Sequence, residues 1–231
     1  MIKNYDEFIQ LIDINSEKNL VKDICKQLMD QNNIECRSFS STDFNRWYHY
    51  VTDSASIEYG NLVIKDNPNW TMVLHELCHL LVVEPELREF VDIDTNKSYK
   101  KLNEKYPENR LLRTESCTFG LQQIIMDQYD INASFNGAFF NGKVGSKESD
   151  VPKEWVERAQ SVLDRIQNDI VVKKEIPTIH DGHIIPEDNT QVLALLNNGT
   201  YFKCGFKSGN YKKLLNNNPI TKCNVVKWSY L

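Results

Sequence analysis

The stretch His75-Glu76-Leu77-Cys78-His79 carries the strongest signal in this chain. It spells H-E-x-x-H within an apolar run, in which Glu76 is the only charged residue between Thr71 and Val83. An α-helix advances about 100° per residue, so side chains four residues apart lie on the same face. His75 and His79 can therefore direct ring nitrogens at one cation. Glu76 lies to the side of that face, where its carboxylate can reach a water on the cation.

The surroundings of this stretch predict a buried helix. Asn67-Pro68-Asn69 predicts its start, with Pro68 at the first helical position, and Glu84-Pro85 predicts its end. Burying an unpaired carboxylate is costly, and a metal site would give Glu76 a partner. The pattern is typical of zinc-dependent hydrolases, normally peptidases. The alternative is a core helix that carries two histidines by chance.

Two histidines do not complete a catalytic zinc site, which usually has three protein ligands and a water. A third histidine could follow on the same segment, but Val82 and Pro85 stand where that pattern needs glycine and histidine. The best candidate is Glu115, an acidic residue in a second mostly apolar helix expected over residues 113–126. The apolar residues near helical spacing there are Leu111, Leu112, Phe119, Ile125 and Met126. Five other glutamates lie in polar surroundings and are expected to be solvated: Glu84, Glu86, Glu89, Glu104 and Glu108.

These segments resemble the ImmA/IrrE-type zinc metallopeptidases. The second motif of that family runs roughly E-A-N-x-F-A-x-x-L-L-M-P, and this chain has E-S-C-T-F-G-L-Q-Q-I-I-M-D from Glu115 to Asp127. An extended edge strand within 57–64, running into the first motif, fits the family as well. The gap between the two motifs is longer than expected for the family, and its polar, lysine-rich residues 84–110 look like an inserted loop.

The resemblance and the motif together predict an active site. Zn²⁺ would be held by His75, His79 and Glu115, with Glu76 as the catalytic base. Two histidines and a carboxylate can also hold iron, manganese or cobalt. The hydrogen-bond donor for a tetrahedral intermediate stays open, with Tyr129, His180 and His183 as candidates.

The resemblance also implies a kind of substrate. Members of the family often cut a repressor or another regulatory protein, so we expect a protein or peptide substrate, such as a transcriptional repressor. Two alternatives stay open. One is a non-catalytic binding or scaffold protein with a structural or vestigial zinc site, and the other is a zinc hydrolase of non-peptide amides.

Composition restricts the other classes of function. The net charge of −5 argues against binding nucleic acid through phosphate contacts. We expect no membrane span and no signal peptide, and hence a cytoplasmic protein of unknown oligomeric state. The six cysteines include no C-x-x-C pair, so free thiols are expected. A second metal site built from Cys204, Cys223, His180 and His183 is a minor alternative.

The periodicity of the chain predicts an α+β fold with two parts. Residues 1–170 would form a zincin-like catalytic domain, in which the active-site helix packs on a small sheet. Residues 171–231 would form a small β-rich module that is a candidate for substrate recognition.

Several further elements are expected in these two parts. In the first part we expect helices within 4–32 and 155–166, a strand at 34–39, a strand or cleft wall at 47–51, and a loop or hairpin at 132–150. In the second part we expect a hairpin around Asn198-Gly199 and a last strand from Val225. His180-Asp181-Gly182-His183 favours a turn with two surface histidines.

Overall fold

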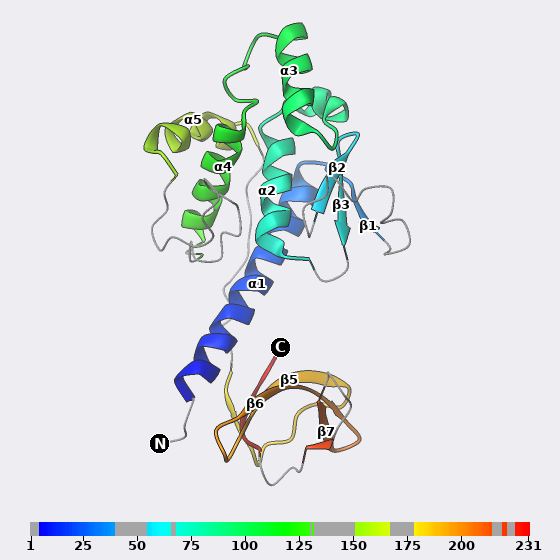
Figure 1. Cartoon of the computed structure of the whole chain (residues 1–231), viewed down its shortest axis with the longest axis vertical. Helices are drawn as coiled ribbons and strands as arrows, with labels where there is room; N and C mark the ends of the chain where they lie inside the picture. The colour runs from blue at the N-terminus through cyan, green and yellow to red at the C-terminus, as the bar shows by residue number, and fades with distance from the viewer. Residues whose placement is uncertain are drawn as a thin grey trace. The chain divides into compact units, whose positions relative to one another are not determined.

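The computed structural model describes residues 5–39, 55–65, 68–129, 131, 151–166, 178–213, 219–220 and 225–231. They form a mixed α+β structure with two sheets (Figure 1), which confirms the expected class. The chain divides into two compact units. One is Val21–Val172, and the other combines Met1–Leu20 with Lys173–Leu231. The elements expected at 47–51 and 132–150 lie outside the described residues.

The first helix, α1 (Tyr5–Gln31), contributes to both units. Its residues up to Leu20 belong to the unit that includes Lys173–Leu231. In that unit Phe8 is fully buried in one cluster with Leu193 and Leu195. Further along, the apolar stripe predicted from the sequence is buried as expected: Leu20, Val21, Ile24, Cys25, Leu28 and Met29.

A three-stranded sheet in the larger unit has the order β1-β3-β2. Strand β1 (Cys36–Phe39) runs parallel to β3 (Asn61–Lys65), and β2 (Ala55–Glu58) runs antiparallel to it. The sequence predicted one extended strand here, whereas the structure has a β2–β3 hairpin. The chain reverses at Tyr59-Gly60, where both residues have positive φ. A side chain at Gly60 would come within 2.6 Å of the Arg88 carbonyl oxygen, so only glycine fits this turn.

Helix α2 (Trp70–Leu81) carries the H-E-x-x-H stretch and packs against β2 and β3 on one side and α4 on the other (Figure 1). It starts later than predicted. Asn69 is the N-cap and accepts from the Thr71 N–H, which leaves Pro68 outside the helix.

The C-terminal end of α2 is stabilised by two arginines. Arg88 Nε donates to the Leu80 carbonyl at 3.1 Å, and Arg165 Nη2 donates to the carbonyls of Leu81 and Val82 at 3.3 and 2.8 Å. The last carbonyls of a helix lack partners within the helix and carry its negative dipole end, so two cations satisfy them.

Residues 84–110 are not the loop that the sequence suggested. They form a 3-10 helix, η2 (Pro85–Phe90), and an α-helix, α3 (Thr95–Lys105). Helix α3 buries Ser98, Tyr99 and Leu102 on one face. The sequence did not indicate this buried face, because most residues of the helix are exposed and many of them are lysines.

Glu84 is also not the solvated charge that was expected. Its carboxylate accepts two hydrogen bonds of 3.0 Å from the guanidinium of Arg113, which is 1% exposed. Arg113 further donates to Asn103 Oδ1 and to the carbonyls of Tyr106 and Glu108. Burial of Arg113 is tolerated because each donor group meets an oxygen, and the network connects the end of α2 to the start of α4.

Helix α4 (Glu115–Gln128) starts two residues later than predicted, because the Thr114 side chain caps it by accepting from the Cys117 N–H. Leu111 lies before the helix and is 62% exposed. Helix α5 (Lys153–Leu163) packs closely on α4. Gly120 permits this approach, because any side chain there would collide with the backbone carbonyl of Trp155.

The C-terminal residues form a six-stranded sheet in which all neighbours are antiparallel, in the order β4-β9-β5-β6-β7-β8. The strands are β4 (His180–Asp181), β5 (Thr190–Leu196), β6 (Tyr201–Lys207), β7 (Asn210–Lys213), β8 (Pro219–Ile220) and β9 (Val225–Tyr230). The expected hairpin and last strand are present. The Leu196 N–H donates to the Thr200 carbonyl, so these two residues close the hairpin. The loop between them has three residues, not the two expected, and its last residue, Gly199, has a φ of 81°.

Other expectations concern cysteines, histidines and membrane spans. Five described cysteines are free, as predicted: Cys25, Cys36, Cys78, Cys117 and Cys204. His180 does not lie in a turn but pairs with β9, and its ring stacks on Trp228 at 4.1 Å. Among the helices described, none combines the length and the apolar character that crossing a membrane requires.

Candidate metal centre

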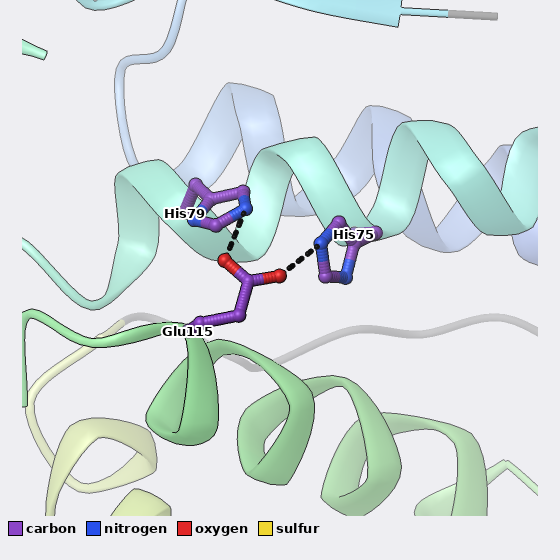
Figure 2. A group of neighbouring side chains, drawn as sticks. All are labelled: His75, His79 and Glu115. Carbon is purple, nitrogen blue, oxygen red and sulfur yellow. Dashed lines mark ion pairs between the residues drawn. The ribbon is translucent and has the colours of Figure 1, made fainter. Parts of the chain in front are cut away.

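The structure brings the three predicted metal ligands together. His75 and His79 lie one turn apart on α2, and Glu115 reaches them from the first residue of α4 (Figure 2). Glu115 Oε1 lies 3.2 Å from His75 Nε2, and Glu115 Oε2 lies 3.4 Å from His79 Nε2. In the described part of the chain, these residues are the one group of three that could hold a metal ion, with ligand atoms within 4.8 Å of one another.

The other ring nitrogen of each histidine is held by a buried polar side chain. His75 Nδ1 lies 3.0 Å from Gln122 Oε1, and the amide nitrogen of Gln122 donates to the Thr71 carbonyl. Because Gln122 uses its N–H group there, its oxygen must accept from His75. His75 therefore carries its proton on Nδ1, and its Nε2 lone pair points towards Glu115.

The same reasoning applies to His79. Its Nδ1 lies 2.9 Å from the Tyr99 hydroxyl and 3.2 Å from Thr118 Oγ1. Each hydroxyl has one proton, and each donates it to a carbonyl: Tyr99 to His79 O and Thr118 to Thr114 O. With the hydroxyl protons on those carbonyls, both oxygens accept from Nδ1, which leaves a lone pair on His79 Nε2 as well.

When both histidines are neutral, two nitrogen lone pairs face one carboxylate, an arrangement in which every group is an electron donor. In the metal-free protein a second proton on His75 Nε2 relieves this conflict, in agreement with its raised pKa, and a metal cation would relieve it in the same way. Tetrahedral zinc with bonds of about 2.0–2.1 Å holds neighbouring ligand atoms roughly 3.3 Å apart. The 3.2 and 3.4 Å separations, each to a different oxygen of Glu115, are close to that value. The donor set could hold a metal ion, and buried polar side chains bond to the other ring nitrogen of each histidine.

In the protein without a metal, the pKa values of the two histidines shift in opposite directions. Burial and the neighbouring His75 lower the pKa of His79 to about 3. Burial also lowers the pKa of His75, but contact with Glu115 and proximity to Glu76 outweigh it and leave that pKa raised. Burial opposes ionisation of Glu115, yet the bond to His75 and the charge of His79 leave its pKa lowered. The carboxylate is therefore ionised and ready to bind a cation.

Glu76 lies beside this group. It is 8% exposed, and burial raises its pKa to about 7. The side chain of Glu115 is 41% exposed, in contrast to 8% for His75 and 4% for His79. Solvent thus reaches the ligands from the side of Glu115.

Aromatic side chains form one wall of the site. The ring of Phe119, on α4, packs against the His75 ring with centroids 4.7 Å apart, and Trp155, on α5, stacks behind it at 6.4 Å. This wall limits the movement of His75 and makes the surroundings of the ligands apolar, which strengthens electrostatic interactions there.

Three residues of the centre were missed in the sequence: Tyr99, Thr118 and Gln122. A signal for two of them was present, because Glu115, Thr118 and Gln122 recur at helical spacing on one face of an otherwise apolar helix. The candidates for a hydrogen-bond donor do not gain support. Tyr129 follows the last residue of α4, roughly 20 Å along the helix from Glu115. His180 is stacked on Trp228 in the other unit, where His183 also lies.

No protein-family model, no curated protein and no solved structure matches this chain. The function must therefore be argued from the geometry of the centre.

Proposed function

We propose that this chain is a zinc-dependent metallopeptidase related in design to the ImmA/IrrE-type enzymes. One observation carries the proposal. The ligand atoms of His75, His79 and Glu115 lie within 4.8 Å of one another, and Glu76 is buried close enough to His75 and Glu115 to feel their charges.

Each residue has a defined role in this proposal. His75, His79 and Glu115 would hold the metal, and Gln122, Tyr99 and Thr118 keep the two imidazoles in the tautomer that binds it. Zinc supplies Lewis acidity, which lowers the pKa of water and polarises a carbonyl. Glu76 accepts the proton of the attacking water and passes it to the leaving nitrogen of the peptide.

The chemistry of the donor set favours a catalytic over a structural zinc site. A structural zinc is almost always held by four protein ligands, whereas a catalytic zinc keeps one position for water or substrate. The described residues provide three ligands, and the exposed side of Glu115 leaves room for a fourth group. A carboxylate buried beside the ligands, such as Glu76, has no function in a purely structural site.

The nature of the substrate rests on the resemblance alone. A specific regulatory protein, such as a transcriptional repressor, stays the expected substrate, and the cytoplasmic location also stays a prediction. Hydrolysis of a non-peptide amide is the alternative within the same chemistry. Turnover of a peptide library but not of small amides would favour the peptidase.

The proposal is tested first by the metal content of the purified protein and then by Glu76→Gln. We expect about one zinc per chain in both the wild type and the variant. Peptide cleavage should fall at least about a hundredfold in the variant, because removal of a general base typically costs 10²–10⁴ in rate. Glu104→Gln is the matched control, since the Glu104 side chain is exposed on α3 and should leave cleavage unchanged.

Two results would contradict the proposal. A chain that neither contains zinc nor takes it up on addition has no working metal centre. If the Glu76→Gln protein cleaves peptides at the wild-type rate, Glu76 is not the base.

A further inference from the structure

Tyr99 differs from Thr118 and Gln122, the other side chains that contact the histidine rings, because it comes from neither α2 nor α4. It lies on α3, within residues 84–110, and it is 3% exposed. Its hydroxyl contacts His79 twice. It lies 2.9 Å from His79 Nδ1 and donates to the backbone carbonyl of His79 at 2.8 Å. One hydroxyl therefore holds both the ring and the main chain of the same residue.

This double contact determines how the ring of His79 is presented. When the hydroxyl donates to the carbonyl, its only proton is used and its oxygen accepts from Nδ1. Thr118 accepts at the same nitrogen from a second direction, at 3.2 Å. A neutral imidazole has one N–H, and with that N–H on Nδ1 the lone pair is on Nε2, the atom next to Glu115.

Helix α3 is fixed well enough to hold Tyr99 in place. Asp94 caps its start by accepting from the Lys97 N–H at 3.0 Å. Near its end, Arg113 donates to Asn103 Oδ1 at 2.9 Å and to the Tyr106 carbonyl at 2.7 Å. The start of the helix is thus capped and its end is attached to Arg113, which holds Tyr99 between two fixed points.

We propose that Tyr99 is a positioning residue that holds His79 in the ring orientation and tautomer that bind the metal. Residues 84–110 then contribute directly to the metal centre through Tyr99 and are not only a connection between the two motifs. This inference rests on the proposed function, because it requires that His79 binds a metal.

The first test is zinc affinity, measured by competition with a chromophoric chelator. Tyr99→Phe removes the hydroxyl and keeps the ring. Loss of an outer-shell partner of a ligating histidine typically weakens metal binding 10–100-fold, and we expect a loss within about that range. Tyr106→Phe is the matched control at the end of the same helix, and it should bind zinc like the wild type.

Thr118 provides a second variant, because it is the remaining acceptor at Nδ1. Thr118→Val should weaken zinc binding less than Tyr99→Phe, since Tyr99 also holds the main chain of His79. The double variant should lose more than the two single losses combined, because no acceptor is then left for the Nδ1 proton.

The second test follows the tautomer directly. Nitrogen-15 NMR of the histidine side chains in the metal-free protein should show His79 with its proton on Nδ1. In the double variant the proton should move towards Nε2. A purely structural role for Tyr99 would lower the melting temperature and leave the tautomer where it is.

The results separate this inference from the proposed function. If the wild type binds zinc and Tyr99→Phe binds it equally well, or if the tautomer does not change in the double variant, Tyr99 does not position His79. If the wild type binds no zinc, the metal centre itself is refuted. Weaker binding in Tyr99→Phe, with Tyr106→Phe unchanged, supports the inference.

Discussion

The interiors of the two units differ in kind. All the buried polar or charged side chains among the described residues lie between Ser56 and Gln123, with the single exception of Ser229 in the C-terminal sheet. The core of that sheet is apolar, with Val192, Phe206 and Trp228 among its buried residues. The interior of the unit Val21–Val172 instead contains uncharged polar side chains and five titratable ones, which are His75, Glu76, His79, Arg88 and Arg113.

This difference shows where the chain departs from what stability alone would favour. An apolar core is sufficient to hold a small sheet, whereas each buried polar group must be matched by a partner. The buried charged groups of the unit Val21–Val172 lie at the metal centre, around Arg113, and at the end of α2, where Arg88 donates to the Leu80 carbonyl. Departures of this kind are expected at functional sites. Substitutions and a change of pH test this comparison, because we expect them to affect the two interiors differently.

The largest effect is expected for Arg113→Met. Removing one partner of a buried ion pair typically costs about 3–5 kcal/mol, because the other charge stays buried without compensation. Hydrogen exchange should become faster in α2 and α4 but not in β5 and β6. Arg110→Met, at an exposed position three residues earlier, should change neither region. Equal acceleration in both units would mean that the two interiors are not independent.

A smaller effect is expected when alanine replaces a tightly packed glycine in each unit. A side chain at Gly120 would collide with the Trp155 carbonyl, and one at Gly182 would collide with the Val225 carbonyl. Each substitution should cost about 1–3 kcal/mol through overpacking. Only Gly120→Ala should also weaken zinc binding, because Gly120 lies on the helix that carries Glu115. Zinc affinity that falls in Gly182→Ala would contradict the separation of the two regions.

The smallest effect is expected from acid. Burial raises the pKa of Glu84, but its bonds with Arg113 and Asn109 outweigh this and lower the pKa to about 2, from 4.5 in an unperturbed glutamate. Because the pKa is lower in the folded protein, the contribution of Glu84 to stability is fully present above about pH 4.5 and is lost as the pH falls towards 2. The protection factors of the α2 amides, which are corrected for the intrinsic pH dependence of exchange, should therefore fall over that range.

Glu84→Gln provides the comparison for the acid effect. The variant should be less stable than the wild type at neutral pH, and its exchange should depend less on pH between 4.5 and 2. A wild type and a variant with parallel pH profiles would show that Glu84 does not cause the acid sensitivity.

Some of this structure could be predicted from the sequence because it depends on local periodicity. The spacing of His75 and His79 places them on one helix face, and Glu115 could be selected as an acidic residue in an apolar segment. The hairpin at Asn198-Gly199 follows from turn chemistry. In each case the information lies within a few neighbouring residues.

The remainder depends on contacts between distant segments. Tyr99 is twenty residues from the histidine that it contacts, and nothing in the lysine-rich sequence around it indicates that α3 folds back onto α2. Glu84 resembles any surface glutamate until Arg113, 29 residues later, is placed against it. The predicted roles of His75, His79, Glu115 and Glu76 in binding metal and in catalysis stay predictions until metal and activity are measured.

The burial of Phe8 with Leu193 and Leu195 restricts where the chain can be cut into parts that fold separately. The C-terminal sheet is not formed by one contiguous segment, because Phe8, which is 185 residues before Leu193 in the sequence, belongs to its apolar cluster. A truncation after residue 172 would deprive Phe8 of its neighbours, and expression of the last 59 residues alone would expose Leu193 and Leu195. Recombination in evolution meets the same restriction, since exchange of this module between proteins requires two crossovers that carry matching segments.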